Sequence, residues 1–91
     1  MQTVYKYSIH IDDIIELSLP VGAEILKADI QHNKLCLWVL IDPNESNNTT
    51  RKLCIAGTGH QIDAPKSSLT YINTFFMEDL GLVFHCFEVS E

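Results

Sequence analysis

Residues 24–41 read EILKADIQHNKLCLWVLI, and this stretch decides the fold. In its first part, three apolar residues alternate with three polar ones: Leu26, Ala28 and Ile30 with Lys27, Asp29 and Gln31. This is the period of a strand with one face in a core and one face in water. The dipeptide His32-Asn33 separates this strand from the apolar run that follows. Because Asn tolerates the positive φ of a tight hairpin, the two segments are predicted to pair as antiparallel strands.

Turn-forming residues punctuate the rest of the chain at short intervals, for example at Pro20-Val21-Gly22 and Asp79-Leu80-Gly81. The segments between them have the length of strands, and none shows a sustained helical period. Strands are expected near residues 3–10, 14–19, 24–31, 34–41, 51–56, 70–76 and 82–89. The predicted fold class is all-β: a small antiparallel sandwich or barrel of about seven short strands, with no substantial helix. We expect a single β domain over residues 1–91, with residues 42–50 as an exposed loop.

Two of the expected strands, residues 35–41 and 82–87, are apolar on both faces. A chain of 91 residues has one core, which covers only one face of each strand. Since no helix is available for the other face, a second copy of the chain is the economical partner and a homo-oligomer is expected. The residues assigned to this interface are Leu35, Leu37, Val39, Val83, His85 and Phe87.

Charge and hydrophobicity exclude several classes of protein. The net charge is −6 and the six Lys and Arg residues are scattered, which opposes binding of duplex nucleic acid. The longest apolar run is far shorter than the ~20 residues that span a bilayer. The N-terminus lacks the pattern of a signal peptide, so we expect a cytoplasmic protein with no membrane partner. The three cysteines lie in separate strand-like runs, which favours buried free thiols.

Short motifs follow one another along nearly the whole chain. They are LPxGAxIL at 19–26, LxLW at 35–38, DP at 42–43, GTGHxI at 57–62, YIxTF at 71–75 and LVFHxFE at 82–88. In this order they resemble a family of short bacteriophage and prophage proteins whose function is uncharacterised. The resemblance implies a phage gene product that acts in the cytoplasm of a host bacterium.

The segment Gly57-Thr58-Gly59-His60 is the most suggestive local feature. Two glycines let a backbone approach a ligand closely and present N–H groups, while Thr and His side chains can contact a phosphate or a base. Arg51 would add positive charge, and Trp38 or Tyr71 would stack on the base. The same segment also suits a turn at the end of a strand, because it lacks the length and the following helix of a phosphate-binding loop.

Catalytic and metal-binding spacings are missing from the sequence. The histidines, His10, His32, His60 and His85, are too far apart to give two ligands on one side of a strand, so no metal and no cofactor is expected. The favoured function is a non-enzymatic binding protein in counter-defence, which sequesters a nucleotide-type signal or docks on a host protein. The alternatives are a small phosphoester hydrolase that uses His60 and a structural protein of the virion.

Overall fold

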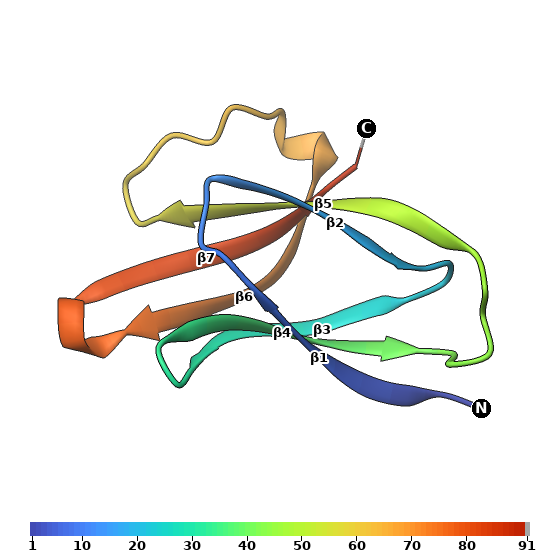
Figure 1. Ribbon diagram of the computed structural model, residues 1–91. Helices are drawn as coiled ribbons and strands as arrows, with labels where there is room; N and C mark the ends of the chain where they lie inside the picture. Colours follow the sequence, from blue (N-terminus) through green and yellow to red (C-terminus); the bar gives the residue numbers. More distant parts are fainter. Residues whose placement is uncertain (91) are drawn as a thin grey trace.

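The computed structural model describes residues 1–90 and confirms the all-β class. Two antiparallel sheets pack as a sandwich (Figure 1), one with the order β1-β4-β3 and the other with the order β2-β5-β7-β6. The strands are β1 (Thr3–Ile9), β2 (Ile14–Pro20), β3 (Glu24–Gln31), β4 (Lys34–Ile41), β5 (Asn48–Gly57), β6 (Leu69–Met77) and β7 (Leu82–Val89). Two short 3-10 turns, η1 (Lys66–Ser68) and η2 (Glu78–Leu80), flank β6. Neither of these helical turns approaches the length of a membrane-spanning helix, and the described part of the chain holds no such helix.

The β3–β4 hairpin forms as the sequence predicts, but a bulge between Ile25 and Lys27 leaves Leu26 41% exposed and not on the predicted core face. Gln31 pairs with Lys34 across the turn, and both turn residues, His32 and Asn33, have positive φ, 52° and 64°. Two consecutive positive values are typical of the turn whose twist matches that of the flanking strands. As a result β4 becomes the central strand of its sheet, between β1 and β3.

The loop expected at residues 42–50 is shorter in the structure, because β5 begins at Asn48. Residues 48–50 lack apolar alternation, but they pair with the end of β2, where Asn48 lies opposite Pro20 and Thr50 lies opposite Ser18. Pairing with a neighbouring strand therefore overrides the polar composition of these residues. The irregular connection is residues 42–47.

The core lies between the two sheets and uses one face of β4. Leu35, Leu37 and Val39 point into it and are at most 1% exposed. The second sheet covers them with Leu53 and Ile55 of β5, Phe75 of β6 and Cys86 of β7, among others. The structure thus corrects the assignment of Leu35, Leu37 and Val39 to an oligomer interface, because their own chain already buries them.

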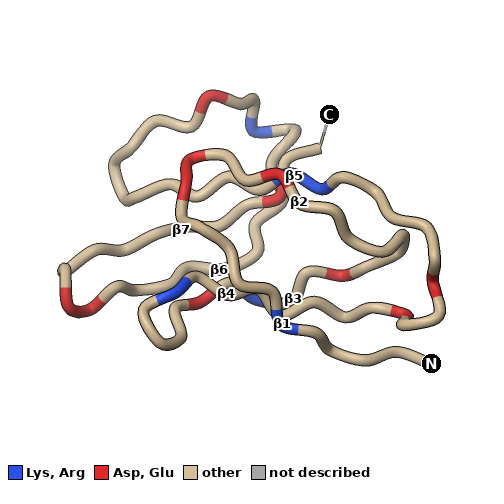
Figure 2. Tube along the Cα trace, viewed as in Figure 1, with Lys and Arg blue, Asp and Glu red and all other residues tan. Residues whose placement is uncertain are grey.

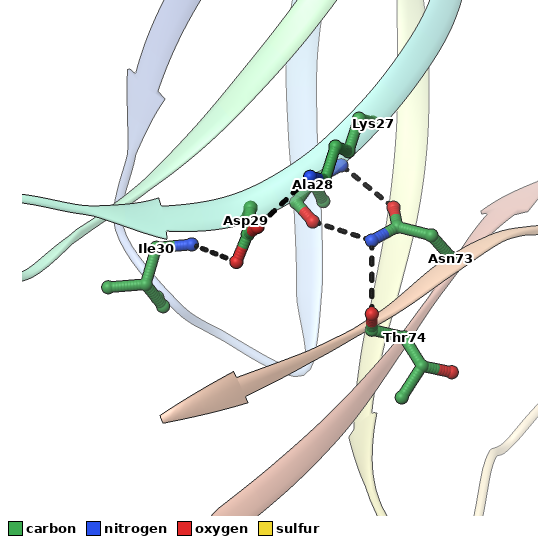
Figure 3. Close-up of polar contacts among 6 residues, drawn as sticks. All are labelled: Lys27, Ala28, Asp29, Ile30, Asn73 and Thr74. Atoms are coloured by element: carbon green, nitrogen blue, oxygen red, sulfur yellow. Dashed lines mark hydrogen bonds and ion pairs between the residues drawn. The ribbon is translucent and has the colours of Figure 1, made fainter. Parts of the chain in front are cut away.

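The two sheets are joined at one edge by the side chain of Asn73. β3 and β6 are each the last strand of their sheet. Asn73 Oδ1 accepts a hydrogen bond from the Ala28 N–H (2.8 Å), and Asn73 Nδ2 donates to the Ala28 carbonyl (2.7 Å), as Figure 3 shows. The amide of Asn73 therefore takes the place of a peptide group in a neighbouring strand.

The connection from β5 to β6, residues 58–68, crosses the outer side of the four-stranded sheet. β5 and β6 both pair antiparallel with β7, so they run in the same direction and the chain must return between them. Because the core occupies the inner side, the connection arches over the side away from β1, β3 and β4 (Figure 1). On this outer side Cys54 and Ala56 of β5 are buried, whereas Tyr71 and Phe76 of β6 are each 58% exposed.

Candidate functional site

Four polar side chains form a hydrogen-bonded chain on the outer side of the four-stranded sheet. Tyr71 Oη lies 2.8 Å from Thr74 Oγ1, and Thr74 Oγ1 lies 2.9 Å from His85 Nδ1. The other ring nitrogen, His85 Nε2, lies 2.7 Å from Thr58 Oγ1. In a neutral imidazole one nitrogen donates and the other accepts, and the two threonine hydroxyls can rotate into the complementary roles. These hydrogen bonds therefore link β6 and β7 to Thr58, the residue that follows β5, and both ring nitrogens of His85 have a partner.

A β-bulge at Ile72 places Tyr71 and Thr74 on the same side of the sheet. In a regular strand, residues three apart point to opposite sides. The register of β6 against β7 shifts after Tyr71, so Tyr71 lies opposite Phe87 and Thr74 lies opposite His85. The rings of Tyr71 and Phe87 make an edge contact with centroids 5.7 Å apart. This contact holds the phenol in line with the hydrogen-bonded chain.

Apolar side chains surround this hydrogen-bonded chain, and the charged residues on the same side of the sheet, Glu16 and Lys52, lie opposite each other on β2 and β5. We name the outer face the set of residues Ile14, Tyr71, Phe76, Val83, His85 and Phe87. Val83, His85 and Phe87 alternate with the core-facing Phe84 and Cys86 along β7, and they are half-buried. Acidic residues lie mostly in the connections between strands instead, as at the tip of the β6–β7 hairpin in Figure 2. The three β7 residues that the sequence assigns to an oligomer interface therefore lie together on the outer face.

Residues Gly57-Thr58-Gly59-His60 form a tight turn. The His60 N–H donates to the Gly57 carbonyl (3.0 Å) and the Thr58 N–H donates to the Val83 carbonyl (3.2 Å), so two of the amides are occupied within the chain. Gly59 has a φ of 88°, which requires glycine. A Cβ on Gly57 would lie 2.9 Å from His60 Nδ1, so this glycine makes room for the imidazole ring. The geometry of the turn thus explains both glycines without a ligand.

Arg51 and Trp38 do not lie with this turn, which corrects the predicted grouping. Arg51 makes a paired contact with Glu88, in which Nη2 lies 2.9 Å from Oε1 and Nε also bonds Oε2, and Nη1 donates to the Ala23 carbonyl (2.8 Å). The Glu88 carboxylate holds the pKa of Arg51 above its ordinary value. Six residues of strand separate Arg51 from Gly57, which is about 20 Å. Trp38 belongs to β4 in the other sheet, opposite Lys6 and Lys27, and so cannot stack with Tyr71 on one base.

Two of the three cysteines, Cys54 and Cys86, are not poised as nucleophiles. Burial, helped by the nearby Cys54 and Glu88, raises the pKa of Cys86 to about 12. Burial and the charge of Asp13 also raise the pKa of Cys54. Thiols with raised pKa values stay protonated at neutral pH and react slowly. Within residues 1–90 no group of three or more His, Cys, Asp or Glu side chains is placed to hold a metal ion.

Two residues of this region, Asn73 and Thr74, were not singled out by sequence reasoning. Thr74 lies inside the YIxTF motif, three residues after Tyr71, where an unbulged strand would point it to the opposite side. The bulge that brings the two hydroxyls together has no signal in the sequence. The structure therefore adds Thr74 to the site and removes Arg51 and Trp38 from it.

The chain belongs to the family described as Domain of unknown function (DUF7352), whose profile matches residues 1–91. No curated protein and no solved structure matches the chain. The sequence motifs also resemble a family whose function is uncharacterised, so the two findings agree that the family has no assigned function.

Proposed function

We propose that this protein is a non-enzymatic binding protein of a phage, which self-associates and docks on a host protein in the cytoplasm of the infected bacterium as a counter-defence. The carrying observation is the outer face, where a satisfied chain of four polar side chains is set among exposed aromatic residues. Exposed aromatic surface whose polar groups are already paired is typical of the core of a protein interface. The order of the phage-like motifs supports the origin and the compartment.

A protein is favoured over a nucleotide as the ligand. Sites for small molecules are concave, and the hollows identified in residues 1–90 lie beside the outer face: one between β3 and β6, which shares Phe76 with it, and one beside Arg51. The groups that would meet a phosphate are dispersed, since Arg51 is paired with Glu88 and the amides of Thr58 and His60 are bonded within the chain. The net charge of −6 further opposes an anionic ligand.

A second copy of the chain is the proposed occupant of the outer face. Two copies that each carry a net charge of −6 repel each other over most of their surfaces. The residues of the outer face carry no formal charge, and the neighbouring Glu16 and Lys52 are of opposite sign, so two copies can meet there with less like-charge repulsion than elsewhere. A contact of this kind would cover what remains exposed of Val83, His85 and Phe87, which are half-buried within their own chain.

Hydrolysis is the second candidate, and a different histidine from the one predicted favours it. Thr58 Oγ1 lies 2.7 Å from His85 Nε2, and Thr74 orients the ring from its other nitrogen, which is the arrangement of a nucleophile and its base. However, the orienting group is a hydroxyl and not a carboxylate, and the Thr58 N–H is occupied by the Val83 carbonyl. His60 packs against Gly57 instead of meeting an acidic partner. Binding is therefore favoured over catalysis.

Sedimentation equilibrium tests self-association. We expect the wild type to be a dimer or larger, and we expect Tyr71→Ser combined with Ile14→Ser to shift it toward monomer. The matched control is Tyr5→Ser, which removes a similarly exposed aromatic ring from β1 in the other sheet. A wild type that stays monomeric at 100 µM, or a control variant that dissociates as readily as the face variant, would contradict the proposed interface.

Two further measurements separate binding from the alternatives. In calorimetry against cyclic and ADP-ribose-type nucleotides we expect no heat of binding. A saturable signal would contradict this and would indicate that the protein sequesters a nucleotide signal. With bis(p-nitrophenyl) phosphate as substrate we expect no turnover. Turnover that disappears in His85→Ala would contradict the proposed binding function and would indicate an enzyme.

A further inference from the structure

A hollow opens between the two sheets where the free edges of β3 and β6 part. The strands are joined at Ala28 and Asn73, and both continue from there toward the hollow. Its volume is about 620 Å³, and its lining comes from Asp29, Ile30, Asn33, Phe76, Met77, Glu78, Asp79 and Leu80. We name these residues the β3–β6 groove. Within residues 1–90 the groove is thus bounded by the edge strands of the two sheets, β3 and β6.

The edge of β3 in this groove presents one residue, Ile30, whose backbone N–H has a replaceable partner. Gln31 and Lys34 flank the hairpin turn, and paired and unpaired residues alternate from there, so Ala28 and Ile30 point their N–H and C=O groups away from β4. The groups of Ala28 are held by Asn73. The N–H of Ile30 donates to Oδ1 of its own neighbour Asp29, at 2.8 Å (Figure 3). A carboxylate that bonds the next residue's amide is a local substitute that an incoming carbonyl can replace.

The side chains of the groove define the chemistry of an occupant. Asp29, Glu78 and Asp79 supply carboxylates, and the groove has no Lys or Arg among its lining residues. Asp29 is also paired with Lys27, but both side chains are exposed and the contact of 3.2 Å is therefore weak. Phe76 and Leu80 are mostly exposed at the rim and would lose water-contacting surface under an apolar partner.

We propose that the β3–β6 groove binds an extended peptide segment of the host partner, with a Lys or Arg between apolar residues, which lies along β3 and bonds its edge at Ile30. This proposal rests on the proposed function and names the partner's chemistry. The peptide's carbonyl takes over the Ile30 N–H, which frees the Asp29 carboxylate for the basic side chain. Apolar residues on either side of the basic one cover Phe76 and Leu80. A second copy is a poor occupant here, because its own surface is acidic and would meet three carboxylates.

A library of random twelve-residue peptides, displayed on filamentous phage and panned on the full-length protein, is the probe. We expect the enriched sequences to share a Lys or Arg flanked by apolar or β-branched residues. A synthetic peptide of the most enriched sequence should bind the wild type and shift the amide resonance of Ile30. For Asp29→Asn combined with Glu78→Gln and Asp79→Asn, we expect its affinity to fall roughly tenfold or more.

A control variant with the same change in net charge isolates the groove. Glu16→Gln combined with Glu24→Gln and Asp63→Asn removes three exposed carboxylates elsewhere, and the peptide should bind it like the wild type. Lack of enrichment, enrichment of peptides without a basic residue, or equal loss in both triple variants would each overturn the proposal. The outer-face variant Tyr71→Ser should still bind the peptide. Loss of self-association and loss of peptide binding therefore report on separate proposals.

Discussion

Replacing Asn73 by Ala should lower the free energy of unfolding by more than the loss of one hydrogen bond would, because Asn73 bonds two backbone groups. The side chain holds both backbone groups of Ala28, with an N–H···Oδ1 distance of 2.8 Å and an Nδ2–H···O distance of 2.7 Å. Ala28 itself is 0% exposed. The substitution would leave a buried donor and a buried acceptor without their partner at the seam between the sheets.

The expected loss follows from these two groups. An unsatisfied buried backbone group costs about 1–3 kcal/mol. Asn73 is half-buried, so water can reach part of the space it leaves and recover some of this energy. We therefore expect Asn73→Ala to lower the free energy of unfolding by about 2–4 kcal/mol, which is a large share of the ~5–15 kcal/mol typical of a domain.

Urea unfolding followed by the fluorescence of Trp38 measures this loss, because Trp38 is the only tryptophan of the chain. Thr70→Ala, at an exposed position of the same strand, is the control and should change stability by less than about 0.5 kcal/mol. Amide hydrogen exchange adds a local readout, in which the Ala28 N–H should lose more protection in Asn73→Ala than the amides of β4. An unchanged unfolding energy together with a protected Ala28 amide would refute the reasoning.

Asn73→Asp tests the direction of the two bonds. A carboxylate can accept from the Ala28 N–H but cannot donate to the Ala28 carbonyl, and the facing oxygens repel. In the folded state this raises the pKa of the introduced carboxyl above its unfolded value of about 4. The destabilisation relative to the wild type should therefore be full at pH 7 and should shrink as the pH falls through that raised pKa.

Three further predictions address other contacts. Arg51→Met should cost about 2–4 kcal/mol in urea unfolding, because it leaves the largely buried Glu88 carboxylate unpaired, whereas Lys27→Met at the exposed pair should cost less than about 0.5 kcal/mol. Gly57→Ala should cost about 1–2 kcal/mol through the clash with His60, and His60→Ala in the same chain should restore most of it; an equal loss in both backgrounds would assign the cost to the backbone. Because the Cys86 thiol has a pKa of about 12 when folded and near 9.0 when unfolded, the unfolded state loses its proton first, and stability should fall above pH 9. The slope from this thiol is about 1.4 kcal/mol per pH unit, and it should be absent in Cys86→Ala.

The strands were predictable from sequence because their signals are local. Alternation and a two-residue turn were enough to predict the antiparallel β3–β4 hairpin, although they did not indicate the shift of register between Ile25 and Lys27. The start of β5 was missed because residues 48–50 become a strand only by pairing with β2. Sequence also gave no means to decide which face of β4 meets the second sheet, and for that reason the core residues Leu35, Leu37 and Val39 were mistaken for an interface.

The candidate site was only partly predictable because it depends on register between distant strands. Thr58, Tyr71 and His85 were all named, each for a different reason, and nothing in their spacing indicates that one hydrogen-bonded chain joins them. Their meeting requires the crossover that brings the end of β5 beside β7 and the bulge that turns Tyr71 toward Thr74. Both are properties of the assembled sheet. The grouping of Arg51 with Gly57–His60 failed for the opposite reason, since closeness in sequence along a strand becomes distance in space.

β6 takes part in both proposed contacts, and this restricts the variants that can separate them. The side chain of Asn73 joins the two sheets beside the groove, and that of its neighbour Thr74 belongs to the hydrogen-bonded chain on the outer side. Asn73 Nδ2 also donates to the Thr74 carbonyl at 3.3 Å (Figure 3). Phe76 belongs to the groove and to the outer face at once. Substitutions at Asn73 or Phe76 would therefore disturb self-association and peptide binding together. Ile14 and Tyr71 belong to the outer face and Asp29, Glu78 and Asp79 line the groove, so effects at these positions are expected to add when they are combined. Strong coupling between the two groups would mean that the peptide and the second copy compete for β6.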